Sequence, residues 1–239
     1  MEHLSTALTP EDRSSAIAQI RRRLRNPNDK NWTLVATSCV EAGVDFSFRT
    51  GFREVSSLLS LLQAAGRVNR HGEYADAEMW SFQLRDDSML RTNKALRAEQ
   101  AVLQRYFSEQ LDIKPDLGTQ FLNDVIAQDS TCLAQIKQML RAEANRQFPV
   151  VEEQFRVIDE TTVSAIVDES LVKEVSLGNG DWKQLQKKAV SIRCGNIQRW
   201  NLKEIAAGVY QWTLRYDAFL GYMRGVLDVE TARNGFLNY

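Results

Sequence analysis

The stretch that decides the fold is Trp32-Thr-Leu-Val-Ala-Thr-Ser-Cys-Val-Glu-Ala-Gly-Val-Asp45, in which a short apolar run leads into a polar loop. The nearly continuous apolar run from Trp32 to Thr37 predicts a strand buried on both faces, as in a parallel sheet. Ligands of such sheets gather beyond the carboxyl ends of the strands. Thr37, Ser38 and Asp45 are therefore expected where a phosphate or a ribose can bind, although many strands end in Thr-Ser for purely structural reasons.

Helical and strand patterns alternate around this strand over the first 85 residues, which indicates βα units. Thr9 begins a helix that keeps an apolar face as far as Arg25, with the threonine hydroxyl capping the amide of Asp12. A second helix is predicted from Ser57 to about Ala65, and another strand from Glu78 to Leu84. The fold class expected for this part is α/β, built around a parallel sheet.

The character of the chain changes twice after this lobe. A long amphipathic helix is predicted over residues 92–110, and further helices over 119–127 and 131–145. Beyond residue 150 short strands are predicted instead, at Phe155–Ile158, Ser164–Val167, Val190–Arg193 and Tyr210–Leu214. We therefore expect a lobe over residues 1–85, a helical connector over 86–150 and a small α+β accessory domain over 151–239.

A second informative segment is Gln63-Ala-Ala-Gly-Arg-Val-Asn-Arg70, placed on the helix that opens with apolar residues. Arg67 and Arg70 are three residues apart, so on a helix both would project from one face. Two guanidinium groups next to Gly66, which permits close approach, suit an anion with several oxygens such as a triphosphate. A solvated or ion-paired arginine pair is the structural alternative.

Composition narrows the class of protein. The net charge of −1 gives no global basic field that would draw the chain to nucleic acid. The cysteines Cys39, Cys132 and Cys194 form no Cys-x-x-Cys pair, so neither a zinc site nor a disulfide framework is indicated, and no metal is expected on this chain. No apolar run is long enough to span a membrane, and the N-terminus has no signal-peptide pattern. We expect a cytoplasmic protein without membrane contact.

The two segments, in this order and spacing, resemble motifs V and VI of superfamily 2 helicases, and in particular the CRISPR-associated helicase–nuclease of type I interference systems. The resemblance is carried by His3-Leu-Ser-Thr6, Thr9-Pro-Glu-Asp-Arg13, Glu41-Ala-Gly-Val-Asp45 and Gln63 to Arg70. It is specific over residues 1 to about 85 and implies that this lobe is the second RecA-like lobe of a helicase. Further along, three stretches are similar to the family's C-terminal domain: Phe155–Asp159, Ile166-Val167 and Leu185–Val190.

The resemblance implies a nucleotide-facing role for several residues. Arg67 and Arg70 would be arginine fingers that reach the γ-phosphate of an ATP held, with Mg²⁺, by the other lobe, and Gln63 would sense the nucleotide. Asp45 would lie near the ribose or couple ATP to DNA. The cofactor-facing set comprises Gly43, Asp45 and Gly66.

The same resemblance implies a track for single-stranded DNA. Thr37, together with Ser38 and the neighbouring amides, would hold a phosphate, a contact that positions the strand without reading its sequence. Ser38-Cys39 departs from the Thr-Gln pair of many relatives, so no nucleotide contact is predicted for Cys39.

A complete motor also needs parts that this sequence lacks. None of its twelve glycines is followed by lysine, so the phosphate-cradling loop Gly-x-x-x-x-Gly-Lys-Ser/Thr is absent. The family's nuclease uses a His-Asp metal cluster, whereas His3 and His71 are not followed by aspartate. Val157-Ile-Asp-Glu160 looks like a metal-holding acidic motif but comes after the motifs that it should precede.

We therefore expect the C-terminal part of an ATP-dependent translocase of single-stranded DNA, inert by itself. Its expected partners are the first RecA-like lobe with the nuclease portion, single-stranded DNA and a guide-RNA surveillance complex. The alternatives are a stand-alone interaction or regulatory module derived from a helicase lobe, or a fragment of another superfamily 2 helicase. The joint presence of Gln63, Arg67 and Arg70 favours the motor, because a binding module does not need all three.

For three further features we expect a structural role and not a functional one. The run Arg21–Arg23 with Arg25 is expected to be a charged outer helix face rather than a DNA contact. His71 is expected to be a solvated histidine at a helix end. Four aromatic residues that could stack on bases are expected to be core residues instead: Trp182, Trp200, Trp212 and Phe219.

Overall fold

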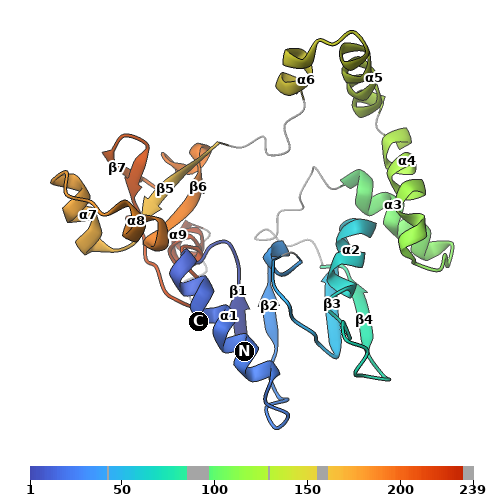
Figure 1. Ribbon diagram of the computed structural model, residues 1–239, viewed down its shortest axis with the longest axis horizontal. Helices are drawn as coiled ribbons and strands as arrows, with labels where there is room; N and C mark the ends of the chain where they lie inside the picture. The colour runs from blue at the N-terminus through green and yellow to red at the C-terminus, as the bar shows by residue number, and fades with distance from the viewer. Residues whose placement is uncertain (42, 85–96, 129, 155–160, 234–239) are drawn as a thin grey trace. The chain divides into compact units, whose positions relative to one another are not determined.

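The computed structural model describes residues 1–41, 43–84, 97–128, 130–154 and 161–233 (Figure 1). The chain divides into two compact units, one made of Met1–Val44 with Ile158–Tyr239 and the other of Asp45–Val157. Compactness thus groups the N-terminal residues with the C-terminal ones, and the division into domains at residues 85 and 150 stays a prediction. Two sequence-based predictions lie outside the described residues: the strand Phe155–Ile158 with its flanking motif residues to Glu160, and the start of the helix over 92–110.

The first unit begins with a βαβ arrangement. Strand β1 (Glu2–Leu4) pairs in parallel with β2 (Leu34–Ala36), and helix α1 (Pro10–Leu24) connects them. The Thr9 side chain accepts a hydrogen bond from the Asp12 amide at 3.2 Å, which confirms the predicted helix start.

One expectation about β2 is wrong. The apolar run predicts a strand buried on both faces, but Val35 is 50% exposed and its neighbours are half-buried. A strand is covered on both faces only inside a wider sheet with helices on either side. In the described part of the chain β2 pairs with β1 alone.

The arginine run of α1 divides between two environments. Arg21 and Arg22 are exposed, as expected for an outer face. Arg23 instead forms ion pairs with Glu2 at 2.7 Å and Asp29 at 2.8 Å. These bonds tie the end of α1 to the first strand and to the loop that follows the helix.

The rest of the first unit is a four-stranded sheet with helices. The strands, in the sheet order β6–β5–β8–β7, are Ala189–Arg193, Thr162–Ile166, Val209–Gln211 and Lys203–Ala206. The helices are α7 (Glu169–Ser176), α8 (Trp182–Lys188) and α9 (Met223–Arg233). Strands predicted near residues 164, 190 and 210 are confirmed, whereas β7 and the three helices were not foreseen.

Aromatic rings fill the core of this sheet domain. Trp200 and Trp212 are buried edge to face with their ring centroids 5.7 Å apart, and Tyr222 lies 5.5 Å from Trp212. The core role predicted for these two tryptophans is confirmed. It is wrong for Phe219, which is exposed, and for Trp182, which is 62% exposed because it begins a short helix that buries Leu185.

Long-range contacts fasten the N-terminal segment to this sheet domain within the same unit. The Tyr216 hydroxyl donates to Asp12 Oδ2 at 2.5 Å and accepts from the Thr9 amide at 3.0 Å. Gly221 lies so close to the N-terminal segment that a Cβ there would be 2.1 Å from the carbonyl oxygen of Ala7. No side chain can be accommodated at that position without moving the backbone.

The second unit contains a parallel pair of strands, β3 (Thr50–Glu54) and β4 (Glu78–Phe82). Helix α2 (Leu58–Ala65) lies between them in the sequence, and Ser57 caps it by accepting from the amide of Ser60. The predicted helix from Ser57 and the strand from Glu78 are both confirmed.

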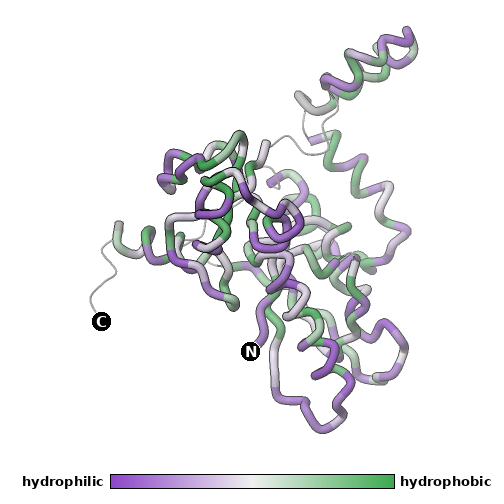
Figure 2. The backbone as a smooth tube through the Cα atoms, turned by 60° about the vertical axis from the view of Figure 1, so that its left-hand side comes forward, coloured by the Kyte–Doolittle hydropathy of each residue, from purple (hydrophilic) through white to green (hydrophobic). Residues whose placement is uncertain are grey.

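Helices complete the second unit. They are α3 (Arg97–Ser108), α4 (Gly118–Gln128), α5 (Ser130–Ala144) and α6 (Phe148–Gln154). Hydrophilic and hydrophobic residues alternate along the helical turns (Figure 2), as expected of amphipathic helices. The core is formed by Leu58, Leu61, Val102, Leu103, Tyr106 and Phe121. Among them Tyr106 is buried, and its hydroxyl donates to Asp124 Oδ2 at 3.0 Å.

Candidate functional site

Residues of the two predicted motifs meet in the second unit. Arg70 Nε lies 3.0 Å from Asp45 Oδ1, and His71 Nε2 lies 4.0 Å from the same oxygen. The side chains of Arg70 and Asp45 are 41% and 64% exposed. A pair this exposed contributes roughly 0–1 kcal/mol to stability, so it orients the two groups more than it stabilises the fold.

Backbone hydrogen bonds bring this arginine segment beside the segment that follows Asp45. The Phe48 amide donates to Arg67 O at 2.8 Å, and the Asn69 amide donates to Phe48 O at 2.7 Å. Asn69 has a φ of +49°, a left-handed conformation that asparagine tolerates better than most residues. Its side chain also closes the loop through hydrogen bonds of 2.7 and 2.9 Å with the backbone of Tyr74.

Asn69 is thus a positioning residue that the sequence analysis missed. Its signal was available in the Val-Asn-Arg order, because an asparagine just after a helix often marks a left-handed turn.

The prediction that Arg67 and Arg70 share one face of a helix is wrong. Helix α2 ends at Ala65 and is capped by Gly66, after which Val68 makes a parallel bridge that pulls the backbone out of the helix. Arg67 is half-buried, with its Nε and Nη1 atoms shielded from solvent, whereas Arg70 is exposed. His71 likewise lies in this loop and not at the helix end. The two arginines therefore have different environments and are not interchangeable.

Gln63 and Gly66 lie at the carboxyl end of α2, and both are exposed. A Cβ on Gly66 would lie 3.4 Å from the carbonyl oxygen of Gln63, an ordinary contact, and the φ of Gly66 is −64°. The fold itself therefore does not require glycine at this position. Any need for glycine would come from a ligand.

The remaining predicted residues belong to the first unit. The Thr37 amide donates to Leu4 O at 3.1 Å, which prolongs the pairing of β1 with β2, and the Thr37 and Ser38 side chains are exposed. Cys39 Sγ lies 3.4 Å from the same Leu4 oxygen, so the thiol turns toward β1. Gly43 has a φ of +78°, and a Cβ there would meet no atom within 4 Å. Glycine is therefore favoured at this position by the backbone conformation and not by a lack of space.

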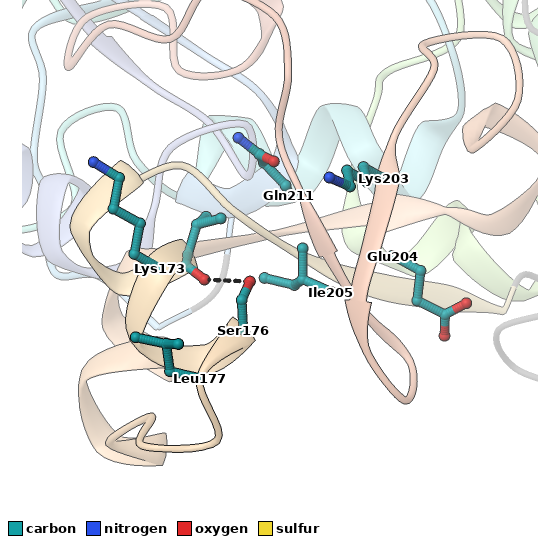
Figure 3. A pocket seen from close by; sticks show the side chains of 8 residues that line it. Lys173, Ser176, Leu177, Lys203, Glu204, Ile205 and Gln211 are labelled. Atoms are coloured by element: carbon teal, nitrogen blue, oxygen red, sulfur yellow. Dashed lines mark hydrogen bonds between the residues drawn. The ribbon is translucent and has the colours of Figure 1, made fainter.

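An open groove of about 530 Å³ lies elsewhere in the first unit (Figure 3). Lys173, Ser176 and Leu177 from the α7 side line it together with Lys203 and Ile205 from β7. The Ser176 hydroxyl is engaged within its own helix, where it donates to Val172 O at 2.8 Å. The groove contains none of the predicted site residues.

Over the described ranges, no group of three or more His, Cys, Asp and Glu residues is placed to hold a metal ion. Within the same ranges, no helix is both long enough and apolar enough to cross a membrane.

The structure is a mixed α/β fold in which an exposed ion pair joins Arg70 and Asp45. Comparisons with known proteins identify the class of protein that it resembles. Residues 2–73 match the family described as the CRISPR-associated nuclease/helicase Cas3, C-terminal. The chain is similar to the C-terminal region of the Cas3 nuclease/helicases, and the resemblance found in the sequence is confirmed.

Relatives and solved structures agree with this relationship. The CRISPR-associated nuclease/helicase Cas3 of Methanothermobacter thermautotrophicus is 28% identical over 115 residues, which cover 46% of this chain and 14% of that protein. The crystal structure of T. fusca Cas3-ATP has a TM-score of 0.55 at 15% identity, covering 88% of this chain and 32% of the other. A chain of a CRISPR RNA-guided surveillance complex, pre-nicking, has a TM-score of 0.51 at 13% identity, covering 90% and 34%.

These comparisons confirm the α/β fold class, and the chain spans about a third or less of each relative. All eight predicted site residues fall within the matched range of residues 2–73. Their individual roles stay predictions.

Proposed function

We propose that this chain supplies the arginine-bearing part of an ATP-dependent motor that pulls single-stranded DNA in type I CRISPR interference. The supporting observation is the ion pair of Arg70 with Asp45, which joins the two segments that carry the resemblance at one exposed place. A phosphate group can approach Arg70 from solvent, and the guanidinium is already oriented by a carboxylate. Such preorganised cations stabilise charge that develops on a transferring phosphoryl group.

Arg67 and Arg70 have separate tasks in this proposal. The exposed Arg70 reaches the γ-phosphate of ATP held by the other lobe. The half-buried Arg67, whose carbonyl oxygen accepts from Phe48, supports the loop and the nucleotide from behind it. Gln63 and Gly66 face the nucleotide from the end of α2.

The cofactor of the complete motor is ATP with Mg²⁺ in this proposal, and the similarity of the fold to T. fusca Cas3-ATP supports the nucleotide. Arg70 and Arg67 suit the phosphates. The described residues hold no cluster of acidic side chains for a cation, so Mg²⁺ is assigned to the first lobe.

Thr37 and Ser38 form part of the DNA track. Their side chains are exposed at the end of β2, and single-stranded DNA would place a phosphate against the Thr37 hydroxyl and nearby amides. The similarity to a chain of a surveillance complex supports the proposal that a guide-RNA complex delivers the strand. The first RecA-like lobe with the nuclease portion is the remaining partner.

The test is hydrolysis of ATP stimulated by single-stranded DNA, measured for the chain alone and mixed with a separately expressed first lobe. We expect activity only in the mixture. The variant Arg70→Ala should lower that activity by about 10³-fold or more, the range typical of an arginine finger. Arg141→Ala, an exposed arginine on α5, is the matched control and should leave the rate unchanged.

Each other outcome is informative. If the two pieces associate but hydrolyse nothing, the chain is a regulatory or interaction module. Robust hydrolysis by the chain alone would contradict the proposal, because the phosphate-cradling loop would then be unnecessary.

A further inference from the structure

Residues 3–9, which we call the N-terminal segment, contact two other segments of the same compact unit. The first is residues 216–222, which lie beyond β8 in the sequence and which we call the anchor segment. The second is the loop that begins at Thr37, directly after β2. All three belong to the unit made of Met1–Val44 and Ile158–Tyr239, so the contacts between them are contacts within one unit.

Tyr216 makes the polar contact at the start of the anchor segment. Its hydroxyl donates to Asp12 Oδ2 at 2.5 Å and accepts from the Thr9 amide at 3.0 Å. Thr9 and Asp12 are the two residues that cap the start of α1. One phenol hydroxyl thus holds both the end of the N-terminal segment and the first turn of the helix that follows it.

The remainder of the anchor segment contacts the N-terminal segment through its backbone. The Tyr222 amide donates to Ala7 O at 3.1 Å, and His3 Nδ1 donates to Phe219 O at 2.5 Å. A Cβ on Gly221 would lie 2.1 Å from Ala7 O, so the two backbones are in direct contact. Closely packed atoms transmit a displacement, because no free space absorbs it.

The other side of the N-terminal segment holds the loop after β2 through a single carbonyl group. Leu4 O accepts from the Thr37 amide at 3.1 Å and from Cys39 Sγ at 3.4 Å. The position of this oxygen therefore fixes the backbone on both sides of Ser38. Thr37 and Ser38 are the residues that form part of the DNA track in the proposed function.

We infer that Tyr216 is a positioning residue for Thr37, acting through the N-terminal segment and the carbonyl group of Leu4. The role in DNA binding rests on the proposed function, whereas the link from Tyr216 to Thr37 does not. A phosphate must meet the Thr37 hydroxyl and the neighbouring amides together, and hydrogen bonds weaken steeply when their geometry is poor. A displaced Thr37 would therefore bind the strand less tightly although Tyr216 itself touches no DNA.

The first measurement is hydrogen exchange of single backbone amides in the full chain. Tyr216→Phe keeps the ring and removes the hydroxyl that holds Asp12 and Thr9. The Thr37 amide should then exchange about 10-fold faster, because loss of a hydrogen bond to a charged group favours local opening of the segments that it joins.

Val175→Ala is the matched control for a general loss of stability in the same unit. Val175 is buried in a cluster that includes residues of neither the N-terminal nor the anchor segment. Its truncation leaves a cavity and should accelerate exchange at Thr37 no more than it does in β5.

The second measurement is binding of a fluorescently labelled oligo(dT) to the full chain at fixed salt, since phosphate contacts depend on salt. Thr37→Val, which removes the hydroxyl, and Tyr216→Phe should each weaken binding by about 3-fold or more. The double variant should bind no more weakly than the weaker single variant, because residues that act through one contact are not additive. Val175→Ala should leave the affinity unchanged.

Three results would overturn the inference. Tyr216→Phe could accelerate exchange at Thr37 no more than Val175→Ala does. Thr37→Val could weaken binding while Tyr216→Phe does not, or the two losses could add in full. If the unaltered chain binds no oligonucleotide, the proposed DNA track fails, and exchange at Thr37 alone decides whether Tyr216 positions it.

Discussion

The two sheets of this chain treat their aromatic residues in opposite ways. The four-stranded sheet of the first unit buries Trp200 and Trp212 against Tyr222. The parallel pair of the second unit exposes Phe52 and Trp80 on its outer face. The first sheet buries its aromatic rings within its own unit, whereas the pair β3–β4 packs, within its own unit, against the cluster that includes Leu58 and Leu61 of α2.

The largest difference in unfolding free energy should be found between alanine variants of two tryptophans, one in each sheet. Trp212→Ala removes a buried ring and should cost about 3–5 kcal/mol of unfolding free energy in the first unit. Trp80→Ala removes an exposed ring and should change the stability of the second unit by less than about 0.5 kcal/mol. Because the chain has two compact units, hydrogen exchange should be read unit by unit. Equal costs for the two variants would remove the distinction between the sheets.

A smaller effect is expected at two tyrosines, one in each unit, whose hydroxyls donate to aspartates. Tyr216 bonds to Asp12 and Tyr106 to Asp124. Tyr216→Phe and Tyr106→Phe should each cost about 1.5–3 kcal/mol, the range for hydrogen bonds to charged groups. Denaturant unfolding of each variant, compared with Tyr74→Phe at an exposed ring, measures it.

The pH dependence sharpens the Tyr216 prediction. Burial, together with the hydrogen bond to Asp12, raises the pKa of Tyr216 to about 12 from the usual 10. A folded-state pKa above the unfolded value means that the folded protein holds the proton more tightly. The stabilisation is therefore complete below pH 10 and is lost as the pH rises from about 10 to about 12. Tyr216→Phe should lack this part of the alkaline loss, and an unchanged alkaline profile would contradict the assignment.

These tyrosines also show what the sequence could and could not predict. Local patterns were sufficient for α1 and α2, because Thr9 and Ser57 cap helices through residues only three positions away. The partners of Tyr216 are more than 200 positions away, so no local pattern contains them. The short strand β7 and the buried role of Tyr106 depend in the same way on packing.

For the candidate site, the sequence names residues but does not predict their geometry. The order and spacing of the motifs identified Asp45 and Arg70, which the structure brings to 3.0 Å. Helical spacing failed for Arg67 because the bridge at Val68, a pairing with a distant segment, ends the helix earlier than the periodicity suggests. Long-range pairing thus decides which of the two arginines is exposed.

The smallest effect concerns two glycines of the predicted site, one in each unit. Gly43 has a φ of +78°, so Gly43→Ala should cost about 1–2 kcal/mol in the first unit, the usual penalty for an alanine in the left-handed region. Gly208→Ala is the matched control, since Gly208 has a φ of +73° and equally open surroundings. Chemical unfolding should give similar losses for both, and a much smaller loss at Gly43 would mean that its loop relaxes into another conformation.

Unlike Gly43, Gly66 has an ordinary backbone conformation, so its substitution can distinguish an effect on nucleotide binding from an effect on stability. Its φ of −64° and its ordinary contacts predict that Gly66→Ala changes unfolding free energy by no more than about 0.5 kcal/mol. If a nucleotide must approach the backbone closely there, the added methyl group lowers ATP hydrolysis in the mixture with the first lobe while stability stays constant. If both stability and hydrolysis are unchanged, Gly66 does not face the nucleotide, and the cofactor-facing set reduces to the loop that ends at Asp45.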